Sequence, residues 1–154
     1  MLNYAQIKDN KILGMSNAPY LNEDILNIEV DDLLYNDYLE YPDKYILDGL
    51  QVVVNPNYEQ EQAEKEKERI GNLTCTKRVF ALMLQELGIT YAQLKELIAT
   101  NEQALLEWDL CVELERKNPL LDVMALQLGV TSAQLDGLFR YANGEITIDD
   151  FRGV

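Results

Sequence analysis

The chain has 154 residues, 47% of them hydrophobic, which is enough apolar material for one packed core or for two small units. It carries 27 acidic against 13 basic residues, a formal net charge of −14, and none of the three segments described below is basic. Direct binding to nucleic acid or to an anionic membrane surface needs clustered Lys and Arg, so neither is expected.

Residues 1–56 predict a small α+β unit with a net charge of −7. Residues 4–7 and 11–15 are expected to form the strands of a hairpin. The residues between them, Asp9 and Asn10, tolerate the left-handed backbone of a tight turn.

A helix is predicted to follow, because Asp31-Asp32 is a good cap for a helix start. Pro42 is expected to end this helix. The predicted apolar face of the helix consists of Leu34, Tyr35, Tyr38 and Leu39.

A second hairpin is predicted from residues 45–47 and 50–54, both rich in aliphatic side chains. Asp48-Gly49 between them favours a two-residue type I′ turn. Pro56 is expected to close this N-terminal α+β unit.

Residues 57–71 predict a charged helical spacer with a net charge of −2 and almost no apolar face. Glu61 precedes Lys65 by four positions and Glu66 precedes Arg69 by three, so ion pairs are expected to brace an exposed helix. Gly71 is its predicted end.

Residues 72–154 predict a helical bundle of about five helices with a net charge of −5. Gly88 and Gly129 are expected to end helices, and the helix that starts at Asn101 is expected to run through Leu114 with Cys111 inside it. Cys75 is expected to open the first helix. The predicted helix caps are Thr74 or Thr76, Thr90, Asn101, Asn118 and Thr131.

The bundle contains an internal repeat, because residues 87–94 recur as residues 128–135. Each copy has the pattern of a helix-turn-helix, whose second helix enters the DNA major groove in many DNA-binding proteins. The exposed positions of the second helices are Tyr91, Gln93, Lys95 and Glu96, and Ser132, Gln134, Asp136 and Arg140. With one basic and one acidic residue in each set, the repeat is interpreted as two packed helical hairpins.

Residues 143–151 resemble the second half of a calcium-binding EF-hand loop. The same register places Phe139 and Tyr141 where oxygen ligands belong, and it places the short side chain of Asp150 at the last position. A glycine turn followed by a helical turn capped by Thr147 explains the same residues, so no metal and no other cofactor are predicted.

Catalytic residues are not predicted, because the chain has no histidine and no phosphate-binding glycine loop. Its two serines, Ser16 and Ser132, stand outside a nucleophile motif. Asp31-Asp32 and Asp149-Asp150 are acidic pairs, but both stand at predicted helix caps. The protein is therefore predicted not to be an enzyme.

The two isolated cysteines indicate buried thiols in a reducing compartment. The N-terminus lacks the basic start and the apolar stretch of a signal peptide, so a cytoplasmic location is expected.

Tyrosine is concentrated at one end, with seven of the nine tyrosines in the first 58 residues, among acidic side chains. Tyr is enriched in protein interfaces because its rigid ring carries a polar tip. Whether Tyr41 and Tyr45 fill a small core or face a partner is open at this point. The predicted partner-binding residues are Tyr20, Tyr35, Tyr38, Tyr41 and Tyr45.

Three segments, residues 4–12, 41–49 and 76–84, together with the end of the helical half at residues 134–139, resemble small proteins encoded in phage and prophage tail regions, near fibre or baseplate genes. The resemblance spans most of the chain and contains no catalytic signature. It implies a virion component or a chaperone-like assembly protein, in the cytoplasm of a bacterial host or in the virion. The implied partner is another phage tail or fibre protein, with no functional residues carried over. Whether the chain also forms a homo-oligomer is open at this point.

Two alternatives follow from the composition. The acidic charge suits a phage-encoded inhibitor that occupies the nucleic-acid channel of a basic host defence protein, although the charge is spread over all three segments. An enzyme without histidine is the second alternative.

Overall fold

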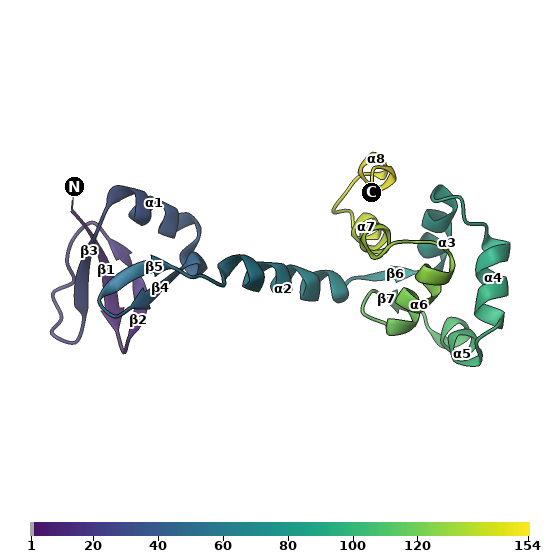
Figure 1. Ribbon diagram of the computed structural model, residues 1–154, viewed down its shortest axis with the longest axis horizontal. Helices are drawn as coiled ribbons and strands as arrows, with labels where there is room; N and C mark the ends of the chain where they lie inside the picture. The colour runs from purple at the N-terminus through teal and green to yellow at the C-terminus, as the bar shows by residue number, and fades with distance from the viewer. Residues whose placement is uncertain (1) are drawn as a thin grey trace. The chain divides into compact units, whose positions relative to one another are not determined.

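The computed structural model describes residues 2–154 and has both strands and helices, so the predicted α+β class is confirmed (Figure 1). The chain divides into two compact units, Met1–Ala63 and Glu64–Val154, called here the N-terminal unit and the C-terminal unit. The charged segment forms one helix, α2 (Tyr58–Gly71), and the division between the units falls within it.

The N-terminal unit contains a three-stranded antiparallel sheet with β1 (Asn3–Lys8) in the centre. β2 (Lys11–Ser16) and β3 (Leu26–Val30) flank it. Asp9 and Asn10 have φ values of 50° and 60°, as a type I′ turn requires, so the first predicted hairpin is confirmed. β3 is an additional strand that the sequence pattern did not predict.

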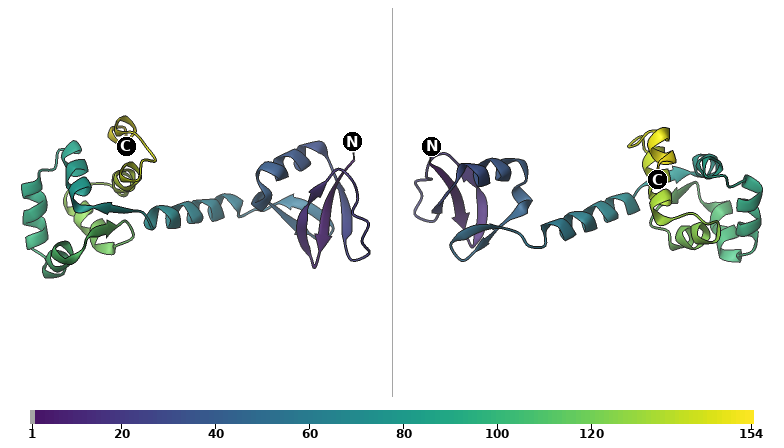
Figure 2. Two further views of the ribbon diagram at one scale, coloured as in Figure 1. Left: turned by 180° about the vertical axis from the view of Figure 1, so that it is seen from behind. Right: turned by 45° about the horizontal axis from the view of Figure 1, so that its top comes forward.

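Helix α1 (Asp32–Glu40) packs over this sheet, as Figures 1 and 2 show. The Asp31 side chain accepts a hydrogen bond from the Leu34 N–H, which confirms the predicted cap. The prediction that Leu39 is buried is wrong, because Leu39 is 59% exposed. A nine-residue helix on short strands is covered along one narrow stripe, and Leu39 lies outside that stripe.

After η1 (Pro42–Lys44), a second hairpin is formed by β4 (Tyr45–Asp48) and β5 (Gln51–Val54). The strands agree with the prediction, but the turn is shifted by one residue. Asp48 pairs with Gln51, so the loop is Gly49-Leu50, and Gly49 alone in it has a positive φ, of 60°. This pattern is typical of a type II′ turn rather than type I′.

α2 has no buried side chain, as expected for a helix without an apolar face. Arg69 binds Glu66 at 2.7 Å, one of the two predicted ion pairs. Glu61 accepts a hydrogen bond from Asn55 Nδ2 at 3.1 Å.

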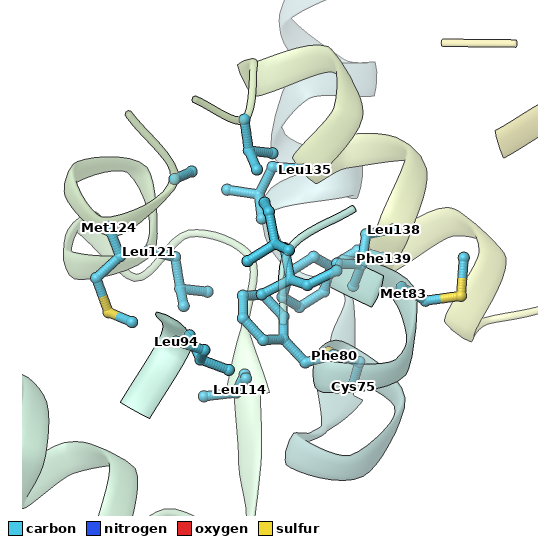
Figure 3. Packing of buried hydrophobic residues seen from close by; sticks show 14 of the residues in the cluster. Cys75, Phe80, Met83, Leu94, Leu114, Leu121, Met124, Leu135, Leu138 and Phe139 are labelled. Atoms are coloured by element: carbon cyan, nitrogen blue, oxygen red, sulfur yellow. The ribbon is translucent and has the colours of Figure 1, made fainter. Parts of the chain in front are cut away.

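The C-terminal unit has one hydrophobic core of 17 buried residues, with Phe80, Leu135, Leu138 and Phe139 near its centre (Figure 3). Asn118 and the threonines 76, 90 and 131 cap helices as predicted, and so does Asn101. The helices are α3 (Lys77–Glu86), α4 (Tyr91–Ala99), α5 (Glu102–Leu110), α6 (Pro119–Gln127), α7 (Ser132–Ala142) and α8 (Ile148–Arg152).

The repeated turn has the same structure in both copies. Gly88 and Gly129 have φ values of 80° and 74°, and the helix that follows each begins with a capping box. In these boxes Thr90 pairs with Gln93, and Thr131 pairs with Gln134.

A short ladder of β6 (Thr74–Thr76) and β7 (Glu113–Glu115) adds strand structure to the helical half. Two predictions are therefore wrong: Cys75 lies in β6 rather than in a helix, and α5 ends before Cys111. The backbone of Cys111 is extended, with φ −73° and ψ 145°, and this lets the chain enter β7. Both cysteines are free thiols, Cys75 buried and Cys111 half-buried.

Candidate protein-binding surface of the N-terminal unit

The two units differ in how they distribute apolar side chains. The only hydrophobic residues buried in the described part of the N-terminal unit are Ala5 and Ile7, against 17 in the C-terminal unit. The large hydrophobic residues that the N-terminal unit exposes are Leu2, Leu13, Tyr20, Leu21, Leu26, Leu33, Leu39, Tyr41, Ile46, Leu50 and Val54. Exposed apolar residues that gather into a patch often mark a binding site, whereas single ones are common on any protein surface.

A polar cluster centred on Asp37 holds three of the predicted tyrosines. The carboxylate of Asp37 accepts hydrogen bonds from Lys44 Nζ at 2.6 Å and from the Tyr45 hydroxyl at 2.5 Å. The Lys44 ammonium lies 5.9 Å from the ring centre of Tyr41 and 5.8 Å from that of Tyr45. The rings of Tyr38 and Tyr45 are 6.1 Å apart. We call these five residues the Asp37 cluster.

The other two predicted tyrosines lie elsewhere. Tyr20 is 53% exposed in the connection between β2 and β3. Tyr35 is half-buried on α1, and neither ring is in one of the aromatic pairs found within residues 2–154. All five predicted tyrosines belong to the same unit.

A groove of about 490 Å³ lies between α1 and the β4–β5 hairpin. Its walls are mostly apolar, and the carboxylates of Asp31 and Asp37 stand among them. The residues lining the groove are Asp31, Leu33, Leu34, Asp37, Lys44, Tyr45, Val52 and Val54. Leu33 is 84% exposed beside this groove, which makes it a ready contact for another chain.

The connection between β2 and β3 presents Leu21 to solvent at 96% exposure. This connection is held in place, because Asn27 Oδ1 accepts from the Tyr20 N–H at 2.8 Å and Asn27 Nδ2 donates to the Tyr20 C=O at 3.0 Å. Sequence reasoning missed Leu21. The signal was present, since a leucine stands alone in a polar loop directly after a tyrosine.

Hydrogen bonding sets the charge state of the Asp37 cluster. The hydrogen bond from Lys44, followed by the one from Tyr45, holds the pKa of Asp37 below its ordinary value. Burial, followed by the hydrogen bond to Asp37, raises the pKa of the Tyr45 hydroxyl to about 12. Because the pKa of Asp37 is lower in the folded chain than in the unfolded chain, the ionised carboxylate stabilises the fold at pH values above about 4, the ordinary pKa of a carboxyl group. This contribution is lost as the pH falls through the folded-state pKa.

We expect Tyr45→Phe to raise the pKa of Asp37 toward its ordinary value, because one of the two donors is removed. The acid unfolding midpoint of the N-terminal unit should rise with it. Titration of the Asp37 carboxyl carbon by NMR measures the change. Tyr41→Phe is the control, since the Tyr41 hydroxyl donates to Glu40 at 2.6 Å, and an equal shift in both variants would contradict the assignment.

The C-terminal unit holds a buried cation, Arg116, whose side chain is 8% exposed. Its guanidinium donates to Asp136 at 2.6 Å, to Asp122 at 3.0 Å and to the Ser132 hydroxyl at 2.9 Å. A cleft of about 970 Å³ opens beside it, but these bonds already occupy Arg116, which acts as a structural tie between the start of α6 and α7. The Ser132 hydroxyl is part of this tie.

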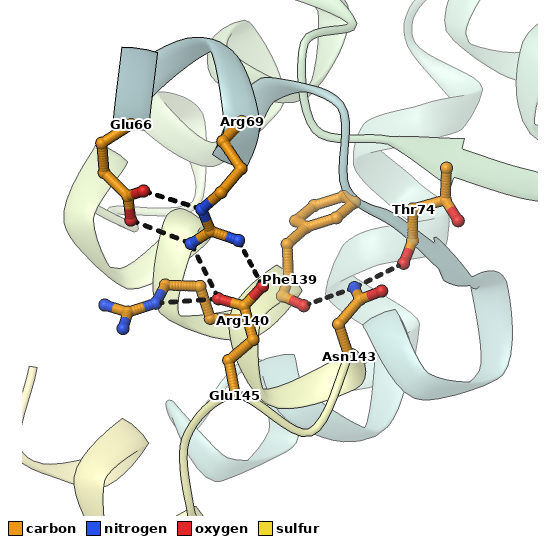
Figure 4. A network of polar contacts seen from close by, with 7 residues as sticks. All are labelled: Glu66, Arg69, Thr74, Phe139, Arg140, Asn143 and Glu145. Atoms are coloured by element: carbon orange, nitrogen blue, oxygen red, sulfur yellow. Dashed lines mark hydrogen bonds and ion pairs between the residues drawn. The ribbon is translucent and has the colours of Figure 1, made fainter. Parts of the chain in front are cut away.

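The EF-hand-like segment is a capped helix start. Gly144 has a φ of 72°, and the Asp150 carboxylate accepts from the N–H and the hydroxyl of Thr147, at 2.9 and 2.7 Å. Glu145 is engaged as well, because it binds Arg69 and Arg140 in the network of Figure 4. The hydrogen bond from Arg69 is the main reason that the pKa of Glu145 is lowered. No cluster of metal-ligating side chains is found in residues 2–154.

In the second copy of the helix-turn-helix pattern, the second helix is largely packed within the unit. α7, the second helix of the second copy, buries Leu135, Leu138 and Phe139 and packs against α3, α6, α8 and β6. Its Asp136 is tied to Arg116. These contacts support the interpretation of the second copy as a packing motif.

Within residues 2–154, no helix is both long enough and apolar enough to cross a membrane. Comparison with protein-family models, with curated protein sequences and with solved structures found no match.

Proposed function

We propose that the protein acts by binding another protein through its N-terminal unit, as a structural or chaperone-like component of phage tail assembly. In this proposal the C-terminal unit, with its hydrophobic core, is a stably folded helical part of the protein. The observation that carries the proposal is the excess of exposed over buried apolar side chains in the N-terminal unit. Burying these side chains against a partner would supply about 25 cal/mol per Å² of apolar surface.

Charge defines the kind of partner. Residues 1–63 contain 3 basic and 12 acidic residues, a net charge of −9. One of the three bases, Lys44, is already paired with Asp37. A partner face that is neutral or basic is therefore favoured, and acidic faces are repelled.

The association with tail assembly comes from the resemblance of the chain to phage and prophage tail-region proteins. An acidic protein with an apolar binding face fits an assembly protein that shields an aggregation-prone fibre or tail subunit. The same surface also fits a permanent virion contact, and both mechanisms bury the N-terminal unit.

The test is affinity capture from cells that express the neighbouring phage genes, with wild type and two matched variants. We expect Leu21→Asp to reduce capture of a tail or fibre protein at least about tenfold, because it places a charge on the most exposed apolar contact. Leu126→Asp is the control, since Leu126 is 79% exposed in the C-terminal unit.

Salt separates this function from the inhibitor alternative. A tail protein that stays bound at high salt supports apolar recognition, whereas a basic host nuclease that is released at high salt would replace the proposal with charge-based inhibition. Equal loss of capture in both variants, or full capture by a chain that begins near Asn72, would show that the N-terminal unit is not the binding unit.

A further inference from the structure

One edge of β5 is unpaired within residues 2–154. β5 pairs with β4 alone, and the Asn55 N–H continues this ladder by donating to the Lys44 C=O at 2.8 Å. Because backbone groups alternate in direction along an antiparallel strand, Val53 and Asn55 face β4, and the N–H and C=O groups of Val52 and Val54 face outward. Such an edge is a template for another extended chain.

β5 carries no charged side chain to protect its edge. Residues 51–55 read Gln-Val-Val-Val-Asn, without a charge, in a unit whose net charge is −9. The outer strand β3, by contrast, carries Glu29, and its Asn27 binds the backbone of Tyr20 in the adjoining connection. β2 and β4 lie beside each other. Among the strands of the N-terminal unit, the edge of β5 is therefore the one most open to pairing.

We propose that β5 pairs in antiparallel fashion with β5 of a second copy of this chain, giving a two-fold dimer through the N-terminal units. With the two-fold axis at Val53, Val52 lies opposite Val54 of the second copy, and each such pair exchanges two backbone hydrogen bonds. An axis at Val52 would bring Leu50, in the turn, opposite Val54. An axis at Val54 would bring Pro56, which has no N–H, opposite Val52.

The side chains in this register complement themselves. Val52 and Val54 lie on the same face of the hairpin and line the groove beside Leu33. Pairing would join the two apolar grooves across the axis and cover Leu33, which is otherwise 84% exposed. Gln51 would lie opposite Asn55 of the second copy. Residues 51–55 contain no carboxylate, so the two paired strands do not repel each other through their own side chains.

Salt gives this contact a signature of its own. Two chains of net charge −14 repel each other, and salt screens that repulsion, so the dimer should become tighter as ionic strength rises. A contact between the acidic unit and a foreign basic strand at the same edge would become weaker under the same change.

The full chain is tested by sedimentation velocity over a concentration series at about 0.05 M and about 0.5 M salt. We expect a monomer–dimer equilibrium that shifts toward dimer at high salt. Val54→Glu should weaken the dimer at least about tenfold, because it places two carboxylates at an apolar contact. Val54→Pro removes the outward N–H and should have a similar effect. Leu13→Glu is the control, since Leu13 is 55% exposed and Val54 52%.

Amide hydrogen exchange of the wild type locates the contact. The Val52 and Val54 amides should gain protection with protein concentration, while the Val53 amide, bonded to β4, should change little. A chain that stays monomeric at high salt would overturn the proposal. So would a dimer that both Val54 variants leave intact, or one that Leu13→Glu weakens equally.

Discussion

Replacing Phe139 by alanine is expected to lower the free energy of unfolding of the C-terminal unit by about 3–5 kcal/mol. Phe139 is fully buried, and its ring lies 6.4 Å from that of Phe80. Phe80 in turn contacts the single tryptophan, Trp108, at 6.3 Å between ring centres. Trp108 fluorescence during urea unfolding therefore reports the loss in this core.

Tyr91→Ala is the matched control for Phe139→Ala, because it removes an aromatic ring that is 46% exposed. Its effect should stay below about 1 kcal/mol. The tyrosine signals of the N-terminal unit, which holds seven of the nine tyrosines, should keep their unfolding midpoint in Phe139→Ala. Equal destabilisation by the two variants would contradict the position of Phe139 at the centre of the core.

Replacing Arg116 by leucine is the second change with a large expected effect. The substitution leaves the carboxylates of Asp136 and Asp122 without their partner and the Ser132 hydroxyl without its donor. Loss of a buried partner costs about 3–5 kcal/mol, but these carboxylates are partly solvated, so about 2 kcal/mol is expected. Urea unfolding followed by Trp108 fluorescence measures this loss of unfolding free energy.

Arg152→Leu provides the comparison for Arg116→Leu. Arg152 binds Glu86 at 2.8 Å, but its side chain is 54% exposed, so the same substitution should change stability by less than about 1 kcal/mol. Equal losses of unfolding free energy in the two arginine variants would contradict the view that burial strengthens the ion pairs of Arg116.

Local sequence signals predicted the helical half well because its helix ends are defined by neighbouring residues. Thr90 and Thr131 cap their helices through residues three positions on, and Gly88 and Gly129 end helices through their own backbone freedom. The ladder of β6 and β7 could not be found in this way. Each strand is three residues long, and the residues that pair across the ladder are about 40 positions apart in the sequence. The pairing therefore depends on the tertiary fold and not on the local sequence.

The candidate binding surface was predicted only in part, for a related reason. Tyrosine enrichment pointed to the unit that buries few apolar side chains, and three of the five predicted tyrosines meet around Asp37. Exposure of Leu39 could not be predicted from helical periodicity, because it depends on how much of α1 the short strands cover. β3 was missed although apolar and polar residues alternate at positions 26–30.

The helix α2 has a practical consequence for handling the protein. A helix without a buried side chain opens locally at little free-energy cost, and an opened backbone is a substrate for proteases. Trypsin cleaves after Lys and Arg, and α2 offers Lys65, Lys67 and Arg69, the last held by Glu66 and Glu145. Purification with protease inhibitors should therefore protect the chain from cleavage within α2, which would separate the two units.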